Sequence, residues 1–237
     1  RVNVLFTQTS DARALVVDMR GEIFLAGTGA INGDSRMMVD KFSCDGSVPG
    51  SVFSDRVSTS FDVPGGTETV SGMAIQPDGK IVLAGSHRPD GSVVDVIVVA
   101  RFDPWRFPRV LDGTFGTNGW VKTDVVGAND VAHAVAVQPD GRIVVVGTTG
   151  GESDARIVVA RYTAAGALDA TFAAGGADGD GVATFDLAGE GASGTDVALL
   201  ADGRILVAGH GRDGGDMDVA VLRLNADGTL DMAFDGD

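Results

Sequence analysis

Four residues that suit the binding of a small anion recur at one position of an internal sequence repeat. They are Arg13, Ser71, His133 and Thr195, spaced about sixty residues apart. A guanidinium, an imidazole and two hydroxyl groups supply hydrogen-bond donors for an anion. If the repeats are arranged around an axis, we expect these side chains to meet at one mouth of a central channel. The alternative is that all four are ordinary channel residues facing water.

A second group of candidate contact residues lies in the stretch DPWRFPRV, which begins at Asp103 and is three residues longer than the matching stretches of the later repeats. Tryptophan and arginine are enriched at binding hot spots, and prolines reduce the entropy lost on binding. The sequence predicts that this loop is the principal contact site, formed by Trp105, Arg106, Phe107 and Arg109. The alternative is that Trp105 folds back and caps its own repeat.

The remaining reactive residues give little support for catalysis or metal binding. His87 and His210, expected in loops between strands, belong to different repeats from His133, and no His-x-His spacing occurs. Asp178 and Asp180 resemble only a fragment of a calcium loop. The single cysteine, Cys44, has no histidine nearby in the sequence, and no Gly-x-Ser-x-Gly motif is present. The sequence therefore predicts no catalytic residue, no metal and no cofactor.

The element that positions these residues is a twelve-residue sequence unit that occurs four times in the chain. AIQPDGKIVLAG (74–85) recurs as AVQPDGRIVVVG (136–147) and ALLADGRILVAG (198–209), and in a diverged form as VVDMRGEIFLAG (16–27). Asp-Gly between two apolar runs is a strong signal for a β-hairpin. Each unit therefore predicts two antiparallel strands.

Two more apolar runs follow each hairpin. The third run is apolar almost throughout, as in VIVVARF, which is typical of a strand covered on both faces. Shorter fourth runs start at Arg56, Gly119 and Gly181. Four strands in about sixty residues make one propeller blade. The sequence predicts an all-β fold, a β-propeller with four four-stranded blades over about 12–62, 70–125, 131–187 and 194–237.

The fourth repeat stops before its own fourth strand. RVNVLFTQTS, at the start of the chain, precedes the first hairpin just as GVATFDLAGEG precedes the last one. We therefore expect residues 1–6 to complete the last blade, so that residues 1–237 form one domain. Whether four blades close alone or two chains form a larger ring stays open.

Other residues recur in every blade and are expected to be structural. They are arginines 101, 161 and 223, aspartates 112, 169 and 231, and phenylalanines 53, 115, 172 and 234. A catalytic group is needed once, whereas a feature copied into each blade is more simply an ion pair or a packing residue.

The order QPDGKIVLAG, VVARF, LDGTF resembles the delta sixty-residue repeat family of bacterial β-propeller repeats. The first repeat departs from the pattern, with Met19-Arg20 in place of Pro-Asp and Lys41 in place of arginine. The resemblance implies a bacterial surface or secreted protein, located outside the cell or on its surface, and implies no catalytic residues.

The charge composition limits the classes of molecule that the protein is expected to bind. The 33 acidic and 18 basic residues give a net charge of −15, which disfavours nucleic acid and anionic membranes. No apolar run is long enough for membrane insertion. We expect a non-enzymatic module, monomer or homodimer, that binds a protein or polysaccharide partner on an exposed loop face. The alternatives are a channel-mouth hydrolase or lactonase using a bound cation, and a purely structural array.

Overall fold

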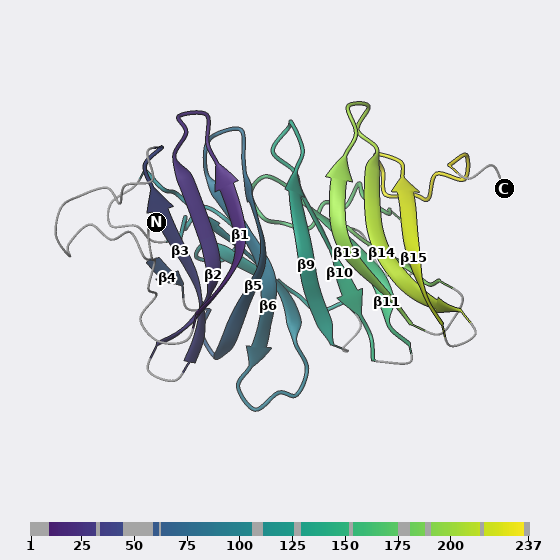
Figure 1. Ribbon diagram of the computed structural model, residues 1–237, viewed down its shortest axis with the longest axis horizontal. Helices are drawn as coiled ribbons and strands as arrows, with labels where there is room; N and C mark the ends of the chain where they lie inside the picture. The colour runs from purple at the N-terminus through teal and green to yellow at the C-terminus, as the bar shows by residue number, and fades with distance from the viewer. Residues whose placement is uncertain are drawn as a thin grey trace.

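The computed structural model describes residues 10–31, 34–44, 59–61, 63–105, 111–125, 129–151, 154–174, 181–187, 191–213 and 216–234. All regular elements in these ranges are β-strands, arranged as four antiparallel sheets that follow one another along the chain. The sheets stand side by side in a row, with the first and the fourth at opposite ends (Figure 1). The predicted all-β class is confirmed. In the described ranges no helix has the length and apolarity needed to cross a membrane.

Each sheet is a meander of strands in chain order. The first sheet consists of β1 (Ser10–Val17), β2 (Ile23–Ile31), β3 (Asp34–Phe42) and β4 (Thr59–Phe61). The second consists of β5 (Gly66–Ile75), β6 (Ile81–Pro89), β7 (Val96–Phe102) and β8 (Trp120–Thr123). The third consists of β9 (Asp130–Val137), β10 (Ile143–Thr149), β11 (Arg156–Tyr162) and β12 (Val182–Phe185). The fourth consists of β13 (Ala192–Leu199), β14 (Ile205–Asp213) and β15 (Asp216–Leu224).

The predicted hairpins are present in all four sheets. The described part of the last sheet has three strands, with β15 at the edge. The N-terminal strand predicted to complete it, residues 1–6, lies outside the described residues.

The glycine that ends each twelve-residue unit is explained by a β-bulge in the first strand of every sheet. In the second sheet the pairing skips one residue between Val70 and Gly72, opposite Gly85. The bulge brings the first strand so close that a Cβ atom on Gly85 would lie 1.8 Å from the carbonyl oxygen of Thr69. Gly27, Gly147 and Gly209 meet the same obstruction, at 2.1, 2.0 and 2.3 Å. Only glycine fits there, which accounts for its recurrence in the sequence.

Three apolar clusters hold neighbouring sheets together, one at each of the three junctions. The middle strands contribute to two clusters at once: Val98 and Phe102 of β7 pack toward the first sheet, whereas Ile97 and Val99 pack toward the third. All four side chains are fully buried. The near-continuous apolar third run is therefore a strand covered on both faces, as predicted.

At each junction after the first, an arginine of one sheet also donates hydrogen bonds within its own repeat and to the next repeat. We call this arginine with its hydrogen-bond partners the polar pin. The guanidinium of Arg161 donates to Asp169 at 2.8 Å and to Thr171 at 3.1 Å, and its centre lies 4.7 Å from the ring centroid of Phe172. The same guanidinium donates to the carbonyl of Ala226, in the turn after β15 of the fourth sheet. Arg101 repeats this arrangement with Asp112, Thr114 and Phe115. It also donates to the carbonyl of Ala164, in the turn after β11 of the third sheet. The recurring Arg–Asp pairs are confirmed as structural.

The predicted phenylalanine contacts are only partly found. Phe115 and Phe172 are fully buried, but Phe234 of the last repeat is 41% exposed because none of the described sheets lies beyond it. Phe53 lies outside the described residues.

We expect Arg161→Met to lower the free energy of unfolding by about 2 kcal/mol, because it removes charged hydrogen bonds from a buried carboxylate and from the next sheet. Arg223→Met is the matched control, since Arg223 pairs with Asp231 at 2.6 Å but is more exposed. Urea unfolding measures both. A loss for Arg223→Met as large as for Arg161→Met would contradict a role for the pin between sheets.

The pin also predicts a pH dependence. Burial alone would raise the pKa of Asp112, but hydrogen bonds from Thr114 and Lys80 and the charge of Arg101 hold that pKa below its ordinary value. A carboxylate with a lowered pKa stabilises the fold above about pH 4 and loses this contribution as the pH falls further. The difference in unfolding free energy between wild type and Asp112→Asn should therefore shrink below about pH 4. A difference that stays constant in acid would contradict this assignment.

Candidate functional site

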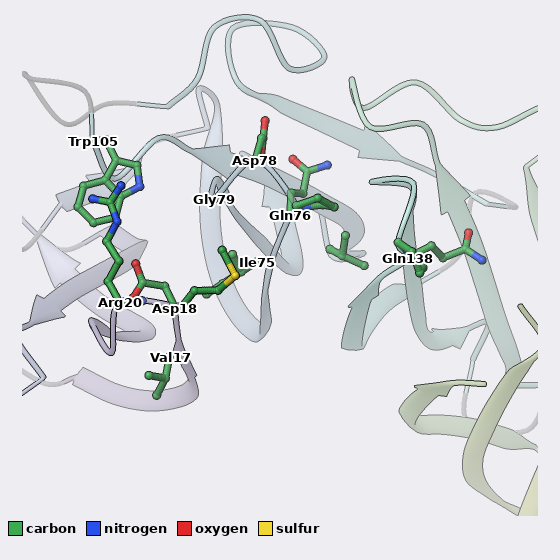
Figure 2. A pocket seen from close by; sticks show the side chains of 13 residues that line it. Val17, Asp18, Arg20, Ile75, Gln76, Asp78, Gly79, Trp105 and Gln138 are labelled. Atoms are coloured by element: carbon green, nitrogen blue, oxygen red, sulfur yellow. The ribbon is translucent and has the colours of Figure 1, made fainter. Parts of the chain in front are cut away.

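A groove of about 510 Å³ opens where the first hairpins of three sheets turn. Its lining comes from the ends of β1, β5 and β9, from the turns that follow them and from the loop after β7 (Figure 2). Val17 and Met19, 54% and 103% exposed, give the first sheet's part of the wall an apolar surface. Ile75 and Val137 continue that surface on the second and third sheets. The groove can therefore take up an apolar group from outside.

Trp105 forms one edge of this groove. The residue extends from the second sheet toward the first, and its ring is stacked with cations of the first sheet. The centroid of the ring lies 4.5 Å from the Arg20 guanidinium carbon and 4.1 Å from the Lys41 ammonium nitrogen. Figure 2 shows Arg20 reaching up to the indole. Trp105 nevertheless stays 44% exposed. The tryptophan thus joins two sheets and also presents a surface.

The polar groups around the groove are largely committed to the protein. Asp18 accepts the backbone N–H groups of Arg20 and Glu22 at 2.9 and 2.8 Å. Gln76 donates to the carbonyl of Gly141 at 2.8 Å and accepts from Arg101 at 3.2 Å. These bonds fix the turns that surround the groove, so its shape is preformed.

Only part of the predicted insertion loop is described. Trp105 lies at the groove, as stated above, while Arg106, Phe107 and Arg109 lie outside the described residues. Sequence reasoning missed the groove partners of Trp105, although a signal existed. Met19, Arg20 and Lys41 are the positions at which the first repeat departs from the others, and they face or stack on the tryptophan of the second sheet.

The four residues predicted at the channel mouth occupy one structural position, the extra residue of the bulge in the first strand of each sheet. None of the four described side chains is hydrogen-bonded to another. Arg13 pairs with Asp11 at 3.0 Å, and Thr195 donates to the carbonyl of Ala208 at 3.2 Å. Ser71 is half-buried. The structure thus supports their equivalence without showing a shared anion site.

His133 takes part in a polar chain that the sequence did not indicate. Its Nε2 lies 3.2 Å from the hydroxyl of Thr148, which lies 2.5 Å from the hydroxyl of Ser193 in the fourth sheet. Burial, together with the nearby His210, lowers the pKa of His133. The chain links the third and fourth sheets beside a small pocket lined by Ser193, His210 and Arg212.

The expected positions of two other histidines are wrong. His87 lies in strand β6, fully buried, with Nδ1 2.9 Å from Glu68 and Nε2 2.7 Å from the ammonium of Lys122. His210 lies in strand β14. The sequence predicts both histidines in loops, but strands β6 and β14 continue beyond the repeated glycines Gly85 and Gly209. Within the described ranges no group of three or more His, Cys, Asp or Glu side chains is arranged to hold a metal; Asp178 and Asp180 lie outside these ranges.

A double-mutant cycle tests the stacking of Trp105. We expect a coupling of about 0.5–1 kcal/mol between Arg20→Met and Trp105→Leu in the free energy of unfolding, because each removes one partner of a cation–π contact. Arg88→Met, which breaks an exposed ion pair with Asp95, is the control and should show no coupling to Trp105→Leu. Additive effects of Arg20→Met and Trp105→Leu would contradict the contact.

A comparison with curated proteins finds no match. Among solved structures, a protein of unknown function from Dyadobacter fermentans DSM 18053 is 14% identical, with 95% of this chain and 83% of that chain covered and a TM-score of 0.39. Sqt1 from Chaetomium thermophilum is 12% identical, with 94% and 61% covered and a TM-score of 0.42.

A family model described as a domain of unknown function (DUF5122) beta-propeller matches residues 76–104, 138–172 and 200–234. The matched segments start at or beside the first hairpin turn of the second, third and fourth sheets and run past their third strands. Over these three segments the chain is therefore similar to a β-propeller family.

Proposed function

We propose that the protein is a non-enzymatic binding module that holds an extended segment of a partner protein in the groove beside Trp105. The observation that carries the proposal is a preformed groove with an apolar wall and a half-exposed tryptophan at its edge. Sites of this kind gain affinity from desolvating an apolar or aromatic anchor. Methionine adds an adaptable surface, and Met19 is fully exposed there.

A protein segment suits this groove better than a polysaccharide. Sugar rings bind tryptophan by lying on a free aromatic face, whereas Arg20 and Lys41 already lie over the ring of Trp105. The wall formed by Val17, Ile75 and Val137 offers dispersion contacts to an apolar side chain, and the neighbouring Gln76 amide is already bonded to Gly141 and Arg101. A basic residue flanking such a side chain would also be favoured by the net charge of −15.

The proposal includes the finer architecture expected from the sequence. Each repeat would be a four-stranded blade, with residues 1–6 completing the last blade, either of the same chain or of a second chain in a larger ring. The family resemblance favours the delta sixty-residue type and a location outside the cell or on its surface. In that setting the predicted contact residues Arg106, Phe107 and Arg109 would extend the site beyond Trp105.

Selection from a displayed library of random peptides supplies a probe. We expect the selected peptides to contain an apolar anchor and to bind Met19→Asp at least about tenfold more weakly than wild type in calorimetry, because a carboxylate on the groove wall opposes desolvation. Val93→Asp is the control, since Val93 is 90% exposed in the loop after β6, remote from the groove.

Two results would overturn the proposal. One is equal affinity of the selected peptides for wild type and Met19→Asp. The other is that no peptide is recovered, while soluble polysaccharides bind the wild type and do not bind Trp105→Ala.

A further inference from the structure

The three junctions between sheets are built from the same pair of faces. We call the side of a sheet that meets the following sheet its rear face, and the side that meets the preceding sheet its front face. The rear face of the second sheet presents Ile97, Val99 and Phe115 to the third sheet. The corresponding residues of the third sheet, which are Ile157, Val159 and Phe172, pack toward the fourth sheet in the same way. All six are fully buried.

The front faces repeat as well. Val135 and Val137 of the third sheet pack on the cluster shared with the second sheet, and Val197 and Leu199 of the fourth pack on the cluster shared with the third. Met73 of the second sheet is buried against the first. Each junction thus joins the rear face of one sheet to the first strand of the next sheet.

Both kinds of face are open at the ends of the row. The rear face of the fourth sheet exposes Val219 by 88%, Val221 by 50% and Phe234 by 41%. The front face of the first sheet exposes Leu15 by 60% and Val17 by 54%. The equivalents of these residues that the structure describes are packed in the internal junctions. The chain therefore presents two different apolar faces, a rear face and a front face, of the kinds that pack against each other at its internal junctions.

The polar pin is also incomplete at the end. Arg101 and Arg161 each donate to a backbone carbonyl of the following sheet. Within the described chain Arg223 donates only to Asp231 of its own repeat, while it still stacks over Phe234 at 4.6 Å. Among the described residues, no carbonyl of a following sheet accepts from Arg223.

We propose that the rear face of the fourth sheet packs against the front face of the first sheet of a second copy of the chain. The first and fourth sheets lie at opposite ends of the row (Figure 1), so these two faces do not meet within the described part of one chain. Because the two faces differ, the contact is head-to-tail and closes into a ring when the rotation between copies permits it. Val17 belongs both to this front face and to the wall of the groove beside Trp105, so the two proposed contacts share that residue.

The second-to-third junction supplies a geometric reference for a test. A Cβ atom at position 72 would lie 3.1 Å from Cγ1 of Val135. The strand register makes Asp196 the equivalent of Gly72 and Leu15 the equivalent of Val135. Cysteines at 196 in one copy and at 15 in another should therefore come within disulfide reach.

Two full-length proteins, Leu15→Cys and Asp196→Cys, both carrying Cys44→Ser, would be mixed and oxidised. We expect a disulfide-linked pair of chains on a non-reducing gel, formed under the conditions in which Gly72→Cys/Val135→Cys in a single chain forms its internal reference bond. Mixing Leu15→Cys with Val93→Cys is the control and should give no linked pair.

Failure to form the 15–196 bond while the reference bond forms would overturn the proposal. A single chain carrying both Leu15→Cys and Asp196→Cys adds a second arm. Linked dimers or higher multiples from that protein support docking between copies, whereas a monomer with an internal disulfide shows that the chain closes on itself and overturns it.

Discussion

The structure depends on strands that are apolar on both faces and therefore require a sheet on either side. β7 and β11 satisfy this requirement inside the chain, where every residue of VIVVARF after the first is buried. Covering both faces of a strand removes roughly twice the apolar area that a one-sided sheet would bury, and this burial is the main favourable term in folding. Stability is thus shared between neighbouring sheets rather than held within one, as in other repeat architectures.

The bulge in each first strand connects this architecture to the candidate sites. The bulge requires glycine at positions 27, 85, 147 and 209. It also leaves one extra residue per sheet outside the strand pairing, and the type of that residue varies between sheets. Arg13, Ser71, His133 and Thr195 are those residues. A repeated backbone constraint and an unrepeated side chain therefore arise from the same local geometry, which is a common way for a bulge to orient a side chain.

Much of the fold could be predicted because repetition makes each signal visible several times. The Asp-Gly turns, the doubly covered third strands and the Arg–Asp pairs follow from residue type and spacing alone. The partners of Trp105 could not be predicted, since stacking on Arg20 and Lys41 joins residues from different sheets that no local pattern relates. The same holds for the link from His133 through Thr148 to Ser193, and for the histidines that proved to lie in strands.

The opposite ends of the row show the limit of sequence reasoning most clearly. Val219 and Val221 match Ile97 and Val99 in type and position, yet only the latter pair is buried, because burial depends on what stands beside the sheet. A residue pattern specifies the need for a neighbour but not which chain supplies it. The exposed apolar area at both ends is of the kind that marks an interaction surface.

The measurement that tests this account most directly is sedimentation equilibrium of the unmodified chain over a wide range of concentration. The account predicts the mass of two chains, or a higher multiple, and a return to the mass of one chain when Val219 is replaced by aspartate. A wild-type protein that keeps the mass of one chain at every concentration would contradict it.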